Sequence, residues 1–271
     1  MEILRKWIED AWNDRMLLQD AKTKEFVTGV IELLDLGKIR VAEKIDGEWQ
    51  TNEWIKKAII LYFAIMPMEE MQAGPLYFFD KIPLKINYRE LGIRVVPHGV
   101  ARFGAYIAKG VILMPSFVNI GAYIDEGTLI DTWATVGSCA QIGSNVHLSG
   151  GVGIGGVLEP VQATPVVIED NCFIGSRCIV VEGVVVEQDA VLGANVVLTA
   201  STKIIDVSMS EPREYRGKIP ARSVVIPGTI PKKFSAGEYQ VPCALIIGQR
   251  KESTDKKTSL NQALREFNVS V

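Results

Sequence analysis

The feature that most constrains this chain is an apolar residue at every sixth position through its middle. Counting in sixes from Val100, all ten positions up to Ile154 are apolar. The series resumes in a new phase at Ile168 and holds for seven positions to Ile204. Neither an α-helix, with a period of about 3.6 residues, nor a flat strand, with a period of about 2, gives this spacing. The repeat therefore predicts a third architecture.

A triangular solenoid has the required period, because each of its three faces takes one short strand and one corner. The aliphatic residue points into the prism on every face, and Gly, Asp, Asn or Ser directly after it suits a tight turn. Successive coils stack about 4.8 Å apart. Hexapeptide repeats of this kind are typical of parallel β-helices. By resemblance to known hexapeptide-repeat proteins, we expect a mainly β fold built on a left-handed parallel β-helix.

The repeat also divides the chain. Residues 1–97 lack it and show helical spacing of apolar residues, which predicts a small, mainly α-helical N-terminal domain. The β-helix is assigned to residues 98–231, with a loop near 157–167 where two prolines and a shift of phase interrupt it. Residues 232–271 are expected to form a short extension of strand and helix, with the helix at 260–267.

Composition excludes several classes of protein. The 29 Lys and Arg against 32 Asp and Glu leave a net charge of −3, which favours neither nucleic acid nor an anionic membrane as partner. The start of the chain does not read as a signal peptide, and the glycine-rich stretch without charges does not read as a membrane span. We therefore expect a cytoplasmic protein, with its four cysteines reduced and buried.

Familiar catalytic motifs are missing from the sequence. It has no phosphate-binding GxxxxGK[ST], no GxSxG and no HExxH. Its "GGVGIGG" lies inside the repeat and not between a strand and a helix, so it is not interpreted as a dinucleotide loop. With only His98 and His147, a three-histidine metal site is not expected.

Longer stretches of the chain resemble the family of tetrahydrodipicolinate N-succinyltransferases. They are "RVAEKIDGEW", "LMPSFVNIGAYIDEGTLIDTWATVGSCAQIG", "NVHLSGGVGIGGVLEP" and "VIEDNCFIGSRC", and the likeness extends over nearly the whole chain. The resemblance implies transfer of succinyl from succinyl-CoA to the amino group of ring-opened tetrahydrodipicolinate, L-2-amino-6-oxopimelate, in diaminopimelate and lysine biosynthesis. It implies direct attack in a ternary complex, small-molecule substrates only, and no permanently bound cofactor. It also implies a homotrimer with active sites between subunits.

The resemblance singles out an aspartate and an arginine as contacts of the substrate. Asp131, in "LIDTWATVG", matches the family aspartate that contacts the substrate amine, which must lose a proton before it attacks. Arg94, in "GIRVVPHG", matches a substrate-binding arginine, and a guanidinium binds a carboxylate through two hydrogen bonds; Arg102 is a second candidate. The alternatives are a corner aspartate that only caps its turn, as Asp125 would, and an arginine in a surface ion pair.

One position departs from the family pattern. Many members have a glutamate where this chain has Ile179, and an isoleucine cannot move a proton. Either Asp131 suffices with bound water, or an acid such as Glu182 or Glu159 replaces the glutamate. His147 is placed at an outward-facing corner, where a structural hydrogen bond is the expected role and catalysis the alternative.

Basic residues near the C-terminal end are candidates for the phosphates of CoA. They are Lys203, Arg222, Lys232, Lys233, Arg250 and Lys251.

Three other functions stay open at this point. One is an N-acetyltransferase acting on the same amine; another is a sugar-nucleotide acyltransferase, which the long matching stretches fit less well. The third is a non-catalytic trimeric scaffold, which would bind no CoA and would tolerate Asp131→Asn.

Overall fold

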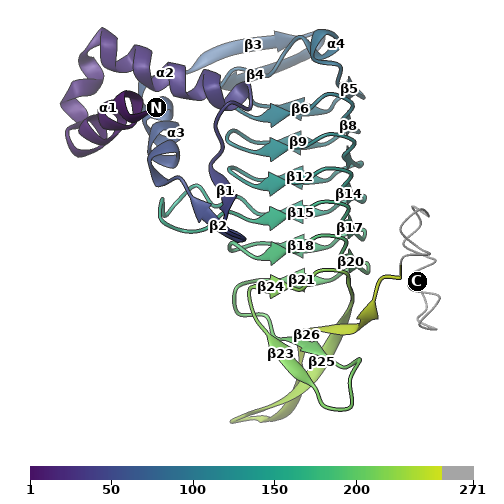
Figure 1. The fold of residues 1–271 in the computed structure, drawn as a ribbon. Helices are drawn as coiled ribbons and strands as arrows, with labels where there is room; N and C mark the ends of the chain where they lie inside the picture. The colour runs from purple at the N-terminus through teal and green to yellow at the C-terminus, as the bar shows by residue number, and fades with distance from the viewer. Residues whose placement is uncertain (252–271) are drawn as a thin grey trace.

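The six-residue repeat builds a three-sided prism of stacked parallel coils (Figure 1). The computed structural model describes residues 1–251, so the predicted helix at 260–267 lies outside the described residues. Each coil contributes a two-residue strand to each side, and each strand pairs in parallel with its equivalent in the next coil. We call the three sheets the first, second and third face, in the order in which the chain visits them from β6 onward.

The strands of the three faces have the following bounds. The first face contains β6 (Val100–Ala101), β9 (Phe117–Val118), β12 (Thr135–Val136), β15 (Gly153–Ile154), β18 (Ile179–Val180) and β21 (Val197–Leu198). The second contains β7 (Tyr106–Ile107), β10 (Tyr123–Ile124), β13 (Gln141–Ile142), β16 (Val167–Ile168), β19 (Val185–Val186) and β24 (Lys218–Ile219). The third contains β5 (Arg94–Val95), β8 (Ile112–Leu113), β11 (Leu129–Ile130), β14 (His147–Leu148), β17 (Phe173–Ile174) and β20 (Val191–Leu192).

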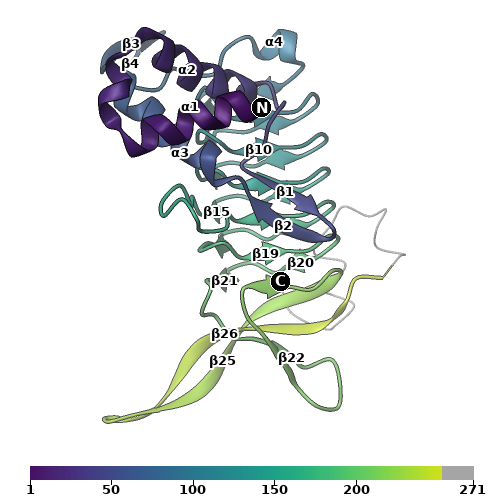
Figure 2. The same cartoon turned by 60° about the vertical axis from the view of Figure 1, so that its left-hand side comes forward.

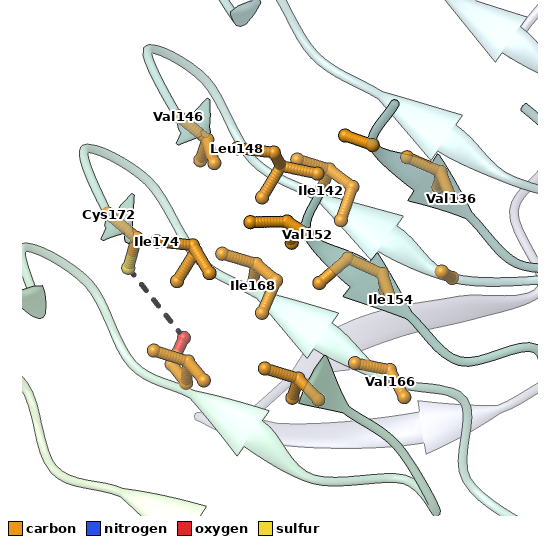
Figure 3. Packing of buried hydrophobic residues seen from close by; sticks show 14 of the residues in the cluster. Val136, Ile142, Val146, Leu148, Val152, Ile154, Val166, Ile168, Cys172 and Ile174 are labelled. Atoms are coloured by element: carbon orange, nitrogen blue, oxygen red, sulfur yellow. Dashed lines mark hydrogen bonds between the residues drawn. The ribbon is translucent and has the colours of Figure 1, made fainter. Parts of the chain in front are cut away.

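The second residue of each strand points into the prism and forms its core. Figure 3 shows Ile142, Leu148 and Ile154 meeting there from three different strands, and all are buried. The same picture shows Cys172 with its thiol directed at the backbone oxygen of Val186. All four cysteines are buried and unpaired, and burial raises the pKa of Cys139 and Cys178 to about 12.

The predicted register is right from residue 118 onward and wrong by one residue before it. The three positions that the count placed in the core are only half-buried, and the residue after each is buried instead. The wrong positions are Val100, Tyr106 and Ile112. The cause is a corner between β8 and β9 that holds only residues 114–116, whereas the next corner holds 119–122. Pro115 lies in the shorter corner, where its ring fixes φ.

Helices cover the start of the prism. They are α1 (Glu2–Asn13), the 3₁₀ helix η1 (Arg15–Gln19), α2 (Ala21–Asp35), α3 (Glu53–Ile65) and α4 (Tyr88–Leu91). The first three α-helices pack around an apolar cluster of their own, which includes Ile8, Val27 and Ile59. The first strand of the prism begins at Arg94, so the division at residue 97 stays a prediction.

Two β-hairpins in this region were not predicted. The hairpin of β1 (Ala42–Ile45) and β2 (Glu48–Thr51) lies across the second face (Figure 2). Glu169, at the edge of that face, accepts hydrogen bonds from Lys44 Nζ at 2.7 Å and from Trp49 Nε1 at 2.8 Å. The second hairpin pairs β3 (Glu69–Ala73) with β4 (Leu76–Asp80).

The interruption of the repeat is an excursion of the chain between β15 and β16, over residues 155–166. It packs beside α3, where the buried Lys56 Nζ donates to Ala163 O at 2.7 Å and to Pro160 O at 3.3 Å. Burial lowers the pKa of this lysine. The contact ties the excursion to the N-terminal helices.

The C-terminal end of the prism carries a long antiparallel hairpin that extends beyond it (Figures 1 and 2). Its strands are β25 (Ser223–Phe234) and β26 (Gly237–Gln249), and they continue the third face together with β22 (Ile204–Asp206) and β23 (Arg213–Tyr215). Because β25 runs through residue 231, the division there also stays a prediction. None of the helices in residues 1–251 has the length and hydrophobicity to cross a membrane.

Candidate active site

Asp131 lies at the corner where the third face turns into the first, directly after β11. Its Oδ1 accepts the backbone N–H of Thr132 at 2.7 Å, which fixes the carboxylate as the cap of the turn. The side chain is 35% exposed, and its other oxygen, Oδ2, accepts no hydrogen bond within residues 1–251. Both roles considered for this aspartate are therefore compatible with one geometry: one oxygen holds the corner and the other is available.

His147 comes next to Asp131 because one coil separates β11 from β14, with His147 opposite Leu129. Its Nε2 lies 3.8 Å from Asp131 Oδ2, and its ring stacks on Phe173 with 4.7 Å between centroids. Burial lowers the pKa of His147, while the Asp131 carboxylate acts in the opposite direction. The expected corner position was wrong, since His147 is a strand residue that points outward from the third face.

Arg94 lies on the same face, at its N-terminal end. Strand pairing places Arg94, Ile112, Leu129 and His147 in one outward ladder. With about 4.8 Å per strand, Arg94 is roughly 10 Å from Leu129 along the face. Its side chain is exposed and has no charged or hydrogen-bonded partner within residues 1–251. The surface ion pair considered as its alternative role is therefore not present in this part of the chain.

Arg102, the second candidate for the substrate carboxylates, is used elsewhere. Its guanidinium pairs with Asp80 on β4 and donates to Asn119 Oδ1 at 3.2 Å. These contacts hold the β3–β4 hairpin against the first coils of the prism.

An apolar groove adjoins the Asp131 corner. Its volume is about 200 Å³, and it is lined by residues from the first coils, including His98, Phe117 and Trp133. Trp133 is 67% exposed, and its ring lies 5.5 Å from that of His98. Among the residues that the structure describes, no three acidic, histidine or cysteine side chains meet as a metal site.

The structure does not bring Glu182 to Asp131 within one chain. Glu182 follows β18 at the corner between the first and second faces, at the far end of the strands from Asp131. Its Oε2 accepts the backbone N–H of Ala200 at 3.1 Å. Ile179 begins β18 and is 36% exposed on the first face. Glu159 is exposed on the excursion at 155–166.

A basic groove of about 560 Å³ lies near the C-terminal hairpin. It brings together Lys203, Lys232 and Arg216, of which the sequence indicated the first two. Arg216 was missed because it lies after Ile204, where the count in sixes ends. Lys203 and Arg216 both contact Glu214, at 3.0 and 3.1 Å.

The other basic candidates lie elsewhere. Arg222 donates to the backbone oxygen of Arg250 at 2.8 Å and lies 3.6 Å from Asp189. Lys233 pairs with Glu238 in the hairpin register and does not line the groove.

Comparison with known proteins gives one consistent family. Residues 3–65 match the model of the tetrahydrodipicolinate N-succinyltransferase N-terminal region, and residues 165–200 match that of the hexapeptide repeat of succinyl-transferase. Proteins called 2,3,4,5-tetrahydropyridine-2,6-dicarboxylate N-succinyltransferase are similar along the whole chain. The one from Aromatoleum aromaticum is 51% identical, over 98% of this chain and 99% of its own. The one from Bordetella pertussis is 53% identical, over 97% and 98%.

A solved structure has the same fold. It is a crystal structure from Campylobacter jejuni, described as a 2,3,4,5-tetrahydropyridine-2-carboxylate N-succinyltransferase, which superposes with a TM-score of 0.53. The superposition covers 82% of this chain and 62% of that one, at 18% identity. This likeness concerns the fold alone and agrees with a parallel β-helix built on hexapeptide repeats.

Proposed function

Because the chain belongs to the family of tetrahydropyridine-dicarboxylate N-succinyltransferases, we propose that its Asp131 corner is the acceptor side of the succinyl-transfer site. The reaction is the transfer of succinyl from succinyl-CoA to the amino group of tetrahydrodipicolinate, in the diaminopimelate pathway. The observation that carries the assignment is the open oxygen of Asp131, on a carboxylate that Thr132 otherwise holds in place.

The acceptor is the ring-opened form, L-2-amino-6-oxopimelate, whose ammonium group binds the open oxygen of Asp131. After losing a proton, the amine attacks the thioester carbon of succinyl-CoA in a ternary complex. Direct transfer is supported by the state of the cysteines, since all four thiols are buried and the pKa of Cys139 and of Cys178 is about 12. A thiol that stays protonated is a poor nucleophile for an acyl-enzyme.

Arg94 binds a carboxylate of this acceptor. It lies on the third face, which also carries His147 and turns into the first face at Asp131, and its guanidinium has no protein partner in the described residues. A separation of roughly 10 Å between strands, shortened by the long arginine side chain, suits a seven-carbon dicarboxylate. Arg94 and Asp131 would then bind opposite ends of one substrate molecule.

The basic groove formed by Lys203, Arg216 and Lys232 binds the phosphates of CoA. Two of its three cations share Glu214, which leaves Lys232 as the cation without an acidic partner within the described residues. Three positive charges around one groove of this size match the charge of a CoA molecule better than that of an amino-acid substrate.

Lys232→Met is expected to raise the KM for succinyl-CoA about three- to tenfold at low salt, because it removes one solvent-exposed ion pair with a phosphate. The KM for the acceptor is expected to stay unchanged. Lys233→Met is the matched control, since it removes the same charge one residue away, outside the groove. Steady-state kinetics at two salt concentrations checks the prediction. An equal rise of KM in both variants would contradict the assignment of the groove.

The active protein is a homotrimer with active sites between subunits. This is supported by apolar side chains that the first face leaves exposed: Phe117, Ile179 and Val197, with Trp133 at its edge. Such a surface is typical of a face that another subunit covers. The mass in solution tests the proposal, because a trimer has three times the 29.8 kDa of the chain.

The coils wind in the left-handed sense, and the chain divides into an N-terminal domain, the β-helix and a C-terminal extension. Short corners support the left-handed winding, because the preference for right-handed crossovers applies to longer connections with a helix. Many corners instead turn at a single residue of positive φ, such as Trp133 at 63°. An experimental density map would test the handedness directly.

Product analysis tests the reaction itself. After incubation with succinyl-CoA and tetrahydrodipicolinate, mass spectrometry is expected to find the acceptor carrying one succinyl group on nitrogen. Free succinate without an acylated acceptor would instead mean that the protein only hydrolyses the thioester.

A further inference from the structure

The proposed reaction requires a group that takes a proton from the substrate amine, beside the carboxylate that binds it. Asp131 Oδ1 already accepts a hydrogen bond from Thr132, and an ionised carboxylate that holds an ammonium stabilises the charged form of that amine. Glu182 is bonded to Ala200 at another corner. The base therefore has to be sought among the other neighbours of Asp131.

Resting on the function proposed above, we propose that His147 is the catalytic base that accepts the proton of the substrate amine while Asp131 holds that amine. Its Nε2 lies 3.8 Å from Asp131 Oδ2. This distance is too long for a good direct hydrogen bond, and it leaves room for one nitrogen atom to contact both groups. The amine would thus bind between the carboxylate and the imidazole.

The fold holds the imidazole in place from both sides along the third face. β14 lies between β11 and β17, so that Leu129 and Phe173 flank His147. The Phe173 ring stacks on it at 4.7 Å, with 31° between the planes. The histidine side chain is nevertheless 34% exposed, which leaves it accessible to a substrate.

The environment favours the neutral imidazole that a base requires. Burial lowers the pKa of His147, and among the charged groups of residues 1–251 it is Asp131 that opposes this effect. At neutral pH the ring is thus mostly unprotonated, and it gains a favourable partner once it becomes an imidazolium.

The substrate binds as an ammonium, so its nitrogen loses two protons in the reaction. His147 takes the first, which frees the lone pair of the amine, and passes it to bulk water before the attack. His147 then takes the second proton from the amine nitrogen as that nitrogen forms its bond to the thioester carbon. The tetrahedral intermediate then collapses, the C–S bond breaks, and the imidazolium returns the proton to the leaving thiolate of CoA. The products are the amide, free CoA thiol and the one proton released to water, and no further reactant is needed.

The test uses the only other histidine of the chain as its control. His147→Gln is expected to lower kcat by about 10²- to 10⁴-fold, the usual contribution of a general base, with the KM for succinyl-CoA unchanged. His98→Gln removes a histidine that has a ring contact to Trp133 and no carboxylate partner in residues 1–251, and it is expected to keep the wild-type pH dependence. Thermal unfolding checks that both variants are folded.

The pH profile distinguishes catalysis from a merely structural role. The base must be unprotonated, so the wild-type kcat/KM for the acceptor, which reports the free enzyme, should fall as the pH drops through the pKa of His147. In a chain with two histidines, NMR with labelled histidine measures that pKa directly, and the His98→Gln spectrum assigns the two signals. Asp131→Asn should lower the pKa of His147 further, because it removes the anion that favours the imidazolium.

Three outcomes separate this inference from the function on which it rests. If wild-type protein succinylates the acceptor and His147→Gln keeps its kcat and its acid limb, His147 is not the base and the function stands. If the variant does not fold, an acid limb of wild-type kcat/KM that does not coincide with the measured pKa of His147 overturns the inference. If wild-type protein shows no acceptor-dependent turnover, the proposed function fails first.

Discussion

Asp131→Asn is expected to lower kcat by about 10³-fold, within the usual range for a positioned acid-base group, while the protein stays folded. The amide oxygen of asparagine can still accept the Thr132 N–H, so the corner keeps the hydrogen bond that shapes it. What disappears is the negative charge that binds the ammonium and stabilises the imidazolium of His147. Steady-state CoA release with both substrates measures the effect.

Asp125→Asn is the matched control for this substitution. Asp125 also follows an inward-pointing strand residue, and its Oδ1 accepts the N–H of Glu126 at 2.9 Å, but it lies at a different corner of the prism. We expect this variant to keep wild-type kcat. Equal activity of both variants would show that Asp131 only caps its turn, as the scaffold alternative requires.

Arg94→Met is expected to raise the KM for the acceptor by about 10- to 100-fold, because a charged hydrogen bond to a carboxylate contributes about 1.5–3 kcal/mol. The exposure of Arg94 places the expected value towards the lower end of this range. The KM for succinyl-CoA is expected to be unaffected, since the basic groove lies at the other end of the prism. Initial rates measured against each substrate in turn separate the two constants.

The control for Arg94 is Arg89→Met, which removes the same charge from the nearby helix α4, outside the third face. A change in net charge alone would alter both variants alike. An acceptor KM that Arg94→Met leaves at the wild-type value would remove this arginine from the site.

The prism could be predicted because its periodicity depends only on which residues are buried. A strand residue that points inward must be apolar in every coil, so the pattern can be recognised in the sequence without knowledge of any contact. The error before residue 118 has the same origin. A count in sixes cannot detect a corner shortened to 114–116 when the residue before each correct position is apolar as well, as Val100, Tyr106 and Ile112 are.

The two hairpins were not predicted because their strands show little alternation of apolar and polar residues. β1 and β2 are mostly exposed, so no apolar face marks them in the sequence. The available signal was the turn between them, Asp46–Gly47, where both residues have positive φ, at 51° and 86°. An Asp-Gly pair of this kind is a strong hairpin signal.

The site was predicted in part. The corner position of Asp131 follows from the repeat, but its pairing with His147 depends on which strands are neighbours. One full coil separates Leu129 from His147, so the pairing of these two residues could have been predicted from the repeat. Applying it to the side chains beside Asp131 would have identified the histidine before the structure did. The basic groove could not be predicted in this way, because most of its residues come after Ile204, where the count in sixes ends.

The most direct test of the account is the rate of CoA release by the purified chain from succinyl-CoA and from acetyl-CoA, each with and without tetrahydrodipicolinate. The account predicts release that requires the acceptor and strongly favours succinyl-CoA. A preference for acetyl-CoA would contradict the assigned donor, and no acceptor-dependent release from a folded protein with either donor would contradict the assigned reaction.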